Sequence, residues 1–221
     1  MCGRFTLHHP TEEIAQRFNL DQIAVSFPPR YNIAPTQPIA VVLQHSARTL
    51  EAFQWGLVPF WAKDPKIGNR MINARAETVA EKPAFRAAFK QRRCLIPASG
   101  YYEWRKENNE RLPTYIYRAD KTPFAFAGLW EEWHAPEGEI LHTCTIITTE
   151  ASDQVSAIHH RMPVIFDPEQ EETWLDPGLN GGDSLAELLH NTSAAELSSH
   201  PVSKQVNPPT FDAPACIEPL A

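Results

Sequence analysis

Cys2 is the residue whose position offers the most distinctive chemistry. The chain starts Met1-Cys2-Gly3-Arg4-Phe5, and an initiator methionine is commonly removed when the next side chain is small. Removal would leave Cys2 with a free α-amine, whose pKa of about 7.7–8.0 keeps much of it neutral at physiological pH. A 1,2-aminothiol condenses with an aldehyde to an imine, and its thiol then closes a thiazolidine ring. A small residue simply buried near the start of a strand is the alternative.

Glu103 is a carboxylate inside the aromatic run Gly100-Tyr101-Tyr102-Glu103-Trp104. Strand alternation places Tyr101 and Glu103 on one face and Tyr102 and Trp104 on the other. Apolar surroundings raise the pKa of a carboxyl group, so that it can act as an acid and a base near neutrality. A solvent-facing glutamate on an edge strand is the alternative.

Two further polar segments interrupt apolar sequence. Asn73 and Arg75 follow an apolar pair, which suits a site loop, although a turn with an asparagine cap explains them equally well. The run His159-His160-Arg161 joins a helical pattern to a strand. Histidine followed by arginine suits phosphate binding or proton transfer, with a surface histidine pair as the alternative.

Aromatic and proline side chains offer contacts for nucleic-acid bases. The segment from Arg30 to Pro35 forms a loop before the first long strand, and the segment from Trp55 to Trp61 ends a strand in a proline-containing turn. On the surface, such side chains can stack on bases or wedge between them. Most tryptophans simply belong to cores, so the interpretation needs the other motifs.

Length and composition indicate an ordinary globular chain of 221 residues, with 43% hydrophobic and 21% charged residues. No apolar run approaches the about 18 residues that a bilayer span needs, and the start lacks a signal-peptide pattern. We therefore expect a soluble, cytoplasmic protein without a membrane partner. The four cysteines are scattered, so we expect no disulfide framework, no metal site and no cofactor.

Charge is distributed unevenly along the chain, whose net charge is −7. Residues 61–118 carry 13 Lys and Arg against 6 Asp and Glu, whereas residues 166–221 carry 1 against 10. A basic middle allows one local phosphate-binding face on an acidic protein. Solvated surface charge explains the same pattern.

Short apolar runs, punctuated by 20 prolines, predict a β-rich fold. The expected strands cover residues 39–43, 50–55, 93–96, 101–104, 114–117, 124–130, 143–148 and 163–166. The expected helices cover residues 11–18, 83–90, 153–159 and 184–190. We predict a single α+β domain over residues 1–221, with a partly closed, barrel-like sheet and peripheral helices. After about residue 206 we expect a loosely ordered end.

The segments together resemble the SOS response-associated peptidase (SRAP) domain family. The matching motifs occur in family order, at Cys2 to Phe5, Arg30 to Pro35, Trp55 to Trp61, Asn73 to Thr78, Cys94 to Pro97, Gly100 to Trp104, Ile158 to Pro163 and His200 to Ser203. No single motif decides the matter, but the ordered set, anchored by a cysteine at position 2, is highly specific. The resemblance covers the chain to about Val206.

The resemblance implies an enzyme that shields abasic sites in single-stranded DNA during the DNA damage response, acting as a monomer on chromosomal DNA. Cys2 would form the thiazolidine with the ring-opened abasic sugar, and Asn73 would orient its amine. Glu103 would help to open the sugar and shuttle protons, and His159 would contact the phosphate of the abasic site. A β-lyase reaction and autocatalytic removal of Met1 are further implied activities.

DNA contacts follow from the same resemblance. Arginines would contact phosphates, while proline and tryptophan would split or stack the flanking DNA. The expected DNA-binding residues are Arg4, Asn32, Pro35, Trp61, Arg75 and Arg161.

Two alternative functions remain. Cys2, His159 and Asn73 are the residue types of a cysteine peptidase triad, and turnover of peptides in trans would support that function. A non-covalent reader of modified DNA would bind abasic and intact strands equally, without a covalent product. A stable adduct with abasic single-stranded DNA would support the crosslinking enzyme.

Overall fold

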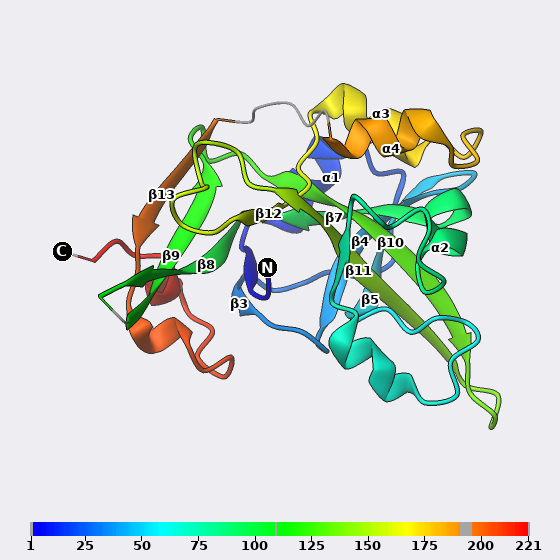
Figure 1. The fold of residues 1–221 in the computed structure, drawn as a ribbon, viewed down its shortest axis with the longest axis horizontal. Helices are drawn as coiled ribbons and strands as arrows, with labels where there is room; N and C mark the ends of the chain where they lie inside the picture. The colour runs from blue at the N-terminus through cyan, green and yellow to red at the C-terminus, as the bar shows by residue number, and fades with distance from the viewer. Residues whose placement is uncertain (1, 109, 191–195, 221) are drawn as a thin grey trace.

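Two β-sheets pack against each other around the N-terminal strand (Figure 1). The computed structural model describes residues 2–108, 110–190 and 196–220. The smaller sheet has the strand order β13 (Leu197–Pro201), β9 (Glu110–Arg118), β8 (Gly100–Glu107), β1 (Phe5–Leu7), β3 (Arg30–Ile33). The larger has the order β12 (Arg161–Pro163), β11 (Ile140–Glu150), β10 (Phe124–His134), β7 (Arg93–Ala98), β4 (Pro38–Gln44), β5 (Arg48–Trp55), β2 (Gln22–Ile23), with β6 (Asn73–Arg75) paired to β11.

The larger sheet closes on itself. Strand β11 pairs in parallel with β5, where Thr143 lies opposite Gln54 and Cys144 opposite Trp55. The strands β11, β10, β7, β4 and β5 therefore form a closed barrel. This arrangement confirms the prediction of a β-rich α+β fold with a barrel-like sheet.

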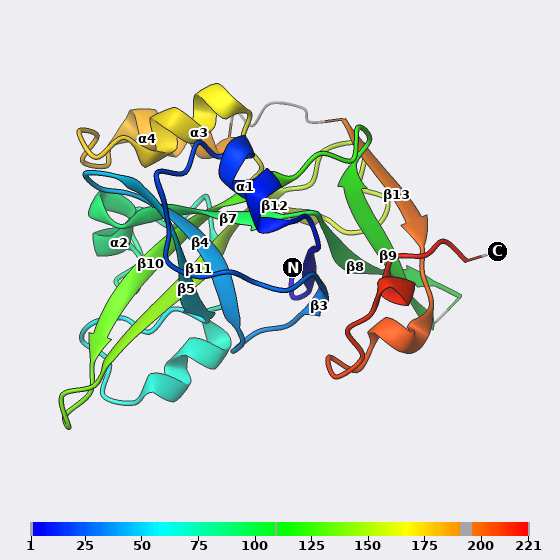
Figure 2. The same cartoon turned by 180° about the vertical axis from the view of Figure 1, so that it is seen from behind.

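Phe5 joins the two sheets. It belongs to β1 of the smaller sheet, yet its ring lies 5.3 Å from Trp55 and 5.7 Å from Phe126 of the barrel, in edge-to-face geometry. All three side chains are almost completely buried. The hydrophobic core is thus continuous from the barrel to β1, and it fixes the start of the chain between the sheets, as Figure 2 shows from behind.

The helices lie at the periphery. They are α1 (Thr11–Arg17), α2 (Arg86–Gln91), α3 (Pro168–Leu175) and α4 (Asp183–His190), with short 3-10 helices at η1 (Pro65–Arg70), η2 (Lys204–Val206) and η3 (Pro214–Cys216). Helices α3 and α4 lie together at one edge of the barrel (Figure 1). None of the described helices is long and apolar enough to cross a lipid bilayer.

The helix predicted at residues 153–159 does not form. The segment is a series of turns, held by bonds such as Val155 N–H to Ser152 O and Ile158 N–H to Val155 O. Only Val155 is fully buried within it, so the apolar pattern covers a single turn and cannot stabilise a longer helix. This irregular segment carries His159, one of the expected site residues.

The end of the chain is packed against the smaller sheet, in contrast to the loose end that the sequence pattern indicates. Val206 and Cys216 are fully buried. Asp212 accepts hydrogen bonds of 2.5 Å from the Arg30 Nε and from the Tyr31 backbone N–H. Hydrogen bonds hold this segment in place, and it forms no long helix or strand. Its sequence therefore shows no regular spacing of hydrophobic residues.

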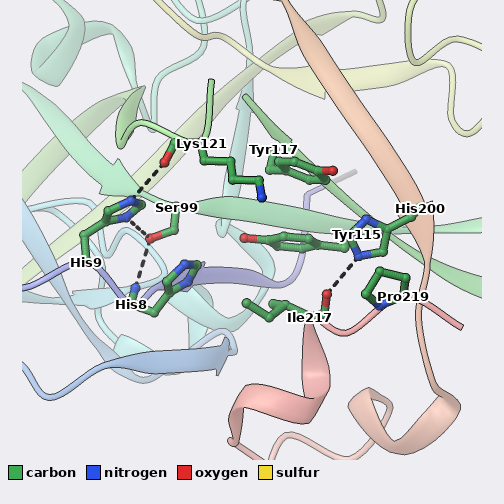
Figure 3. A pocket seen from close by; sticks show the side chains of 9 residues that line it. All are labelled: His8, His9, Ser99, Tyr115, Tyr117, Lys121, His200, Ile217 and Pro219. Atoms are coloured by element: carbon green, nitrogen blue, oxygen red, sulfur yellow. Dashed lines mark hydrogen bonds between the residues drawn. The ribbon is translucent and has the colours of Figure 1, made fainter. Parts of the chain in front are cut away.

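A cavity of about 270 Å³ lies between β9 and this tail (Figure 3). Tyr115, Tyr117, Lys121 and His200 are among its lining residues. Tyr115 lies opposite Tyr102 in the β8–β9 pairing, so both side chains share one face of the sheet. Tyr101 and Glu103 alternate to the other face, and the cavity is therefore separate from the expected catalytic residues.

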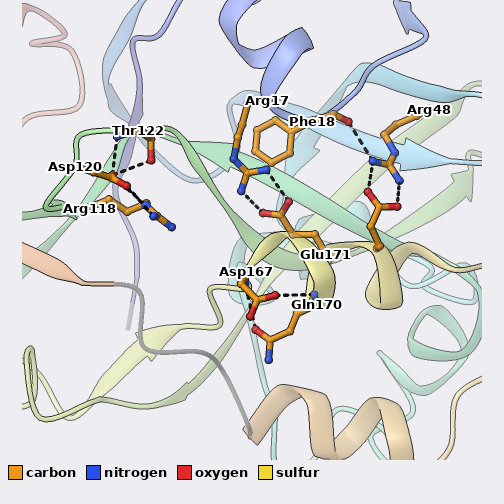
Figure 4. A network of polar contacts seen from close by, with 10 residues as sticks. Arg17, Phe18, Arg48, Arg118, Asp120, Thr122, Asp167, Gln170 and Glu171 are labelled. Carbon is orange, nitrogen blue, oxygen red and sulfur yellow. Dashed lines mark hydrogen bonds and ion pairs between the residues drawn. The ribbon is translucent and has the colours of Figure 1, made fainter.

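Ion pairs attach α3 to the rest of the molecule (Figure 4). Arg17 donates two hydrogen bonds to the Glu171 carboxylate, at 2.9 and 2.8 Å, and the Glu171 side chain is only 6% exposed. Burial raises the pKa of Glu171, while the Arg17 charge opposes this rise. An exposed pair, Arg118 with Asp120, is visible in the same view.

Arg17→Ala should lower the free energy of unfolding by about 3–5 kcal/mol, because it leaves a buried carboxylate without its partner. Arg118→Ala is the matched control and should cost less than about 1 kcal/mol, since its partner Asp120 is exposed. Urea unfolding of both variants checks the difference. Equal losses would show that the Arg17 pair is no more important than a surface pair.

Candidate active site

Asn73 holds the start of the chain in place. It lies on β6, which runs parallel to β11 with Asn73 opposite Ile146. The Asn73 Nδ2 donates a hydrogen bond of 2.8 Å to the backbone oxygen of Cys2. The Asn73 Oδ1 is buried and has no hydrogen-bond partner among the described residues. Its amide therefore has an acceptor available directly beside Cys2.

The Cys2 thiol is completely buried. Its Sγ lies 4.0 Å from the backbone oxygen of Arg4, to which it can donate. Burial raises the pKa of the Cys2 thiol well above its usual value, and the charge of the nearby Glu103 raises it further. The thiol is therefore protonated at neutral pH.

Glu103 reaches the same place from β8. Strand β8 runs antiparallel to β1, with Tyr101 opposite Phe5 and with the Tyr102 N–H donating to Arg4 O at 2.9 Å. Glu103 follows Tyr101 on the same face and is 4% exposed. Burial raises the pKa of its carboxyl group, while the charge of His159 opposes this rise. The environment is that of an acid and base that works nearer to neutrality than an exposed glutamate.

His159 is the last residue of the irregular segment and is half-buried. The Arg161 backbone N–H donates to the His159 Nδ1 at 3.0 Å, and the His160 ring stacks on it at 4.4 Å between centroids. His159 also lines a cavity of about 640 Å³, with Arg75, Glu150, Ala151, Ser156, His160 and Arg161. Glu103 is close enough to Cys2 to affect the pKa of its thiol, and His159 is close enough to Glu103 to affect the pKa of its carboxyl group. The structure thus brings the four expected catalytic residues together.

Arg75 and Arg161 differ in how they are held within this cavity. Arg161 forms a bidentate ion pair with Glu77 and also donates to Thr148 O at 2.6 Å. Arg75 is exposed and makes no ion pair among the described residues. A phosphate could therefore approach Arg75 directly, whereas it would have to compete with Glu77 for Arg161.

Arg4 and Asn32 both contact the C-terminal tail, and their role in binding DNA stays a prediction. Arg4 donates to Asn32 Oδ1 at 2.7 Å and to Val206 O at 2.8 Å. Asn32 is completely buried, and its Nδ2 donates to backbone oxygens that include Phe211 O at 2.6 Å. The two residues therefore attach the tail to β3, and a phosphate would have to compete with the tail for the half-buried Arg4.

Trp61 and Pro35 lie near the same end of β5. Trp61 is 50% exposed and its neighbour Phe60 is 58% exposed, in the loop that follows β5. Pro35 is half-buried in the turn between β3 and β4. The Thr36 backbone N–H in this turn donates a hydrogen bond of 2.8 Å to Trp55 O. The two adjacent exposed aromatic rings give an apolar surface that suits stacking on bases.

Sequence reasoning missed three participants of the site. Glu77 and Thr148 position Arg161, and Phe60 extends the exposed aromatic surface. Glu77 lies within a matching motif, but nothing in its spacing predicts its ion pair. Among the described residues, no three His, Cys, Asp or Glu side chains are placed to hold a metal ion.

Comparison with known proteins identifies the family of this chain. The model of the SOS response associated peptidase (SRAP) family matches residues 1–209. The chain belongs to this family. Its relatives include the abasic site processing protein YoqW of Bacillus subtilis (strain 168), which is 44% identical over 222 residues, with 99% of each chain covered.

More distant proteins are also similar to this chain. The abasic site processing protein HMCES of Xenopus tropicalis is 34% identical over 223 residues, with 86% of this chain and 66% of that protein covered. A crystal structure of a Bacteroides thetaiotaomicron protein has a TM-score of 0.89 at 28% identity, with 100% of both chains covered. The two-sheet fold is therefore shared with a solved structure.

Proposed function

We propose that this protein processes abasic sites in single-stranded DNA and forms a covalent bond to the abasic sugar through Cys2. The observation that supports this most directly is the hydrogen bond from Asn73 to the Cys2 backbone, beside the buried carboxyl group of Glu103. Together these residues hold an N-terminal aminothiol next to an acid. The relatives at 44% and 34% identity are named abasic site processing proteins.

The chemistry begins with removal of Met1, which frees the α-amine of Cys2. The Glu103 carboxyl group donates a proton to the ring oxygen of the sugar hemiacetal, the C1′–O4′ bond breaks, and the C1′ hydroxyl gives its proton to solvent, so that the ring opens to the aldehyde. The amine attacks the aldehyde carbon, and the resulting hydroxyl group takes up a proton from solvent and leaves as water, which gives an iminium ion. The thiol sulfur then bonds to the same carbon and closes the thiazolidine. Overall, one aldehyde and one aminothiol give one ring and one water.

Asn73 has a defined part in this sequence. Its Oδ1 can accept a hydrogen from the α-amine, so that the nitrogen lone pair is directed to the aldehyde. Its Nδ2 is already occupied by the Cys2 oxygen. The iminium ion also acidifies the adjacent C2′ hydrogens, so β-elimination of the 3′ phosphate is a further activity of the same intermediate.

The DNA strand would lie across the cavity that contains His159 and Arg75. Arg75 contributes a positive charge to its lining, and His159 is placed near Glu103. These two side chains suit a phosphate next to the abasic sugar. The exposed Phe60 and Trp61 would stack on unpaired bases. A preference for single strands follows from this use of stacking.

A cysteine peptidase fits the geometry less well. A peptidase needs a thiolate that an adjacent histidine stabilises, whereas burial raises the pKa of the Cys2 thiol. The Asn73 amide donates to the backbone of Cys2, and the His159 Nδ1 accepts from Arg161. The Asn73 Nδ2 and the His159 Nδ1 are thus engaged in contacts other than those of a triad.

An uncleavable N-terminal extension tests the proposed function. The extension keeps the thiol of Cys2 but converts its amine into a peptide bond, so neither imine nor thiazolidine can form. Extended and unextended proteins are incubated with abasic single-stranded DNA, and adducts are counted after denaturing electrophoresis. We expect adducts only without the extension. Normal crosslinking by a protein whose mass shows an intact extension would overturn the proposal.

A further inference from the structure

The hydroxyl group of Tyr101 is buried without a hydrogen-bond partner among the described residues. The tyrosines next to it differ, because Tyr102 donates to Tyr31 O at 2.7 Å and the Tyr115 hydroxyl lies 3.0 Å from Thr6 Oγ1. Leaving a hydroxyl unpaired in the interior is unfavourable, because the group loses its hydrogen bonds to water and gains none in the protein. Such exceptions are few in folded proteins, and a catalytic role is one of their recognised explanations.

Tyr101 lies inside the proposed active site. It alternates with Glu103 on one face of β8, and it lies opposite Phe5 on β1, the strand that follows Cys2. Its ring packs at 6.0 Å from Phe126 of the barrel. Burial raises the pKa of the Tyr101 hydroxyl far above its usual value, and charges on Cys2 and Glu103 add to this rise. The hydroxyl therefore remains a hydrogen-bond donor throughout the physiological pH range.

A hydrogen-bond donor near the Cys2 sulfur would stabilise the charge that develops during ring closure. As the thiol proton of Cys2 passes to Glu103, thiolate character develops on a sulfur that is cut off from water, and it persists until the C–S bond to the iminium carbon has formed. The Arg4 oxygen, 4.0 Å from Sγ, is an acceptor and cannot stabilise this charge. The Asn73 Nδ2 is occupied by the Cys2 oxygen.

We propose that the Tyr101 hydroxyl donates a hydrogen bond to the Cys2 sulfur while the thiazolidine closes. This inference rests on the function proposed above. In the step, the C–S bond forms, and the electron pair of the C=N bond returns to nitrogen. The thiol proton passes to the Glu103 carboxylate, which has already given its own proton to the opening sugar. The products are a neutral thiazolidine and a protonated Glu103.

Tyr101→Phe tests the role, because it removes only the hydroxyl oxygen. The variant is mixed with abasic single-stranded DNA, and samples are split at each time. Borohydride traps the imine in one half, and heating without reductant leaves only the closed ring in the other. We expect imine formation within about 2-fold of the unaltered protein. Ring closure should be at least about 10-fold slower, since loss of one donor to a developing oxyanion costs about 10²–10³.

Tyr102→Phe is the matched control, because it removes a hydroxyl that is already paired on the opposite face of β8. It should lower the unfolding midpoint and leave ring closure unchanged. Tyr101→Phe should leave the midpoint unchanged or raise it, since an unpaired buried group is lost. Unchanged closure in Tyr101→Phe, or an equal slowing of imine formation and closure, would overturn the inference. If the unaltered protein forms no imine and no ring, the proposed function itself fails.

Discussion

Cys2→Ala is expected to abolish every DNA adduct that survives heat and denaturant. The variant keeps an α-amine, so it can still form an imine with the opened sugar. Without the thiol, however, no second bond to the aldehyde carbon can form, and water reverses the imine. Borohydride should therefore reveal an adduct that is absent without reductant. The measurement compares reduced and unreduced samples on a denaturing gel.

Cys216→Ala is the control for this prediction. Cys216 is also buried, but it lies in the tail cluster with Val202 and Val206. Its removal should leave stable crosslinking intact, which excludes a general effect of losing a cysteine. Full-strength stable crosslinking by Cys2→Ala would contradict the assignment of the thiol.

Glu103→Gln should slow crosslinking and its reversal by about 10²–10⁴, the usual cost of losing a general acid and base. Glutamine keeps the shape of the side chain but cannot exchange a proton as a carboxyl group does. Binding to intact single-stranded DNA should remain nearly unchanged. Single-turnover rates at saturating DNA measure the effect.

The pH dependence follows from the direction of the pKa shift. Burial raises the pKa of Glu103, so its acid form persists to higher pH than that of an exposed glutamate. The crosslinking rate should fall as pH rises through this pKa, because the proton donor is lost. The α-amine opposes this trend, since it becomes reactive as it loses its proton. Glu103→Gln should remove the fall that belongs to the carboxyl group.

His159→Ala distinguishes the two roles. It removes a proposed phosphate contact, so its rate should fall most at low DNA concentration and recover towards saturation. Glu103→Gln should stay slow at every concentration. If instead saturating DNA rescues Glu103→Gln and fails to rescue His159→Ala, the two assignments are reversed.

The strands that the sequence predicts well are the apolar ones. The pattern at residues 39–43, 50–55 and 124–130 gives β4, β5 and most of β10. Residues 39–43 and nearly all of 124–130 are buried, and β5 buries Leu50, Phe53 and Trp55. The hydrophobic pattern does not predict elements whose position is set by polar hydrogen bonds. Helix α3 was missed although Asp167 and Gln170 form a capping box with a proline at the first turn, which is a recognisable start signal.

In the candidate site, too, strand alternation was predictable from the sequence, whereas long-range polar contacts were not. Alternation along β8 correctly separates Tyr101 and Glu103 from Tyr102 and Trp104, since the first pair lies near Cys2 and the second packs with the tail. The contacts of Arg4 with Asn32 and Val206 could not be predicted, because these partners lie 28 and 202 positions away along the chain. Long-range polar bonds leave no periodic trace in a sequence.

The measurement that tests the central claim most directly is an intact-mass spectrum after incubation with an abasic single-stranded oligonucleotide. The account predicts a protein mass without Met1. It also predicts an adduct that equals this protein plus the oligonucleotide minus one water, and that is stable without reductant. An adduct on protein that retains Met1, or no adduct at all from protein that has lost Met1, would contradict it.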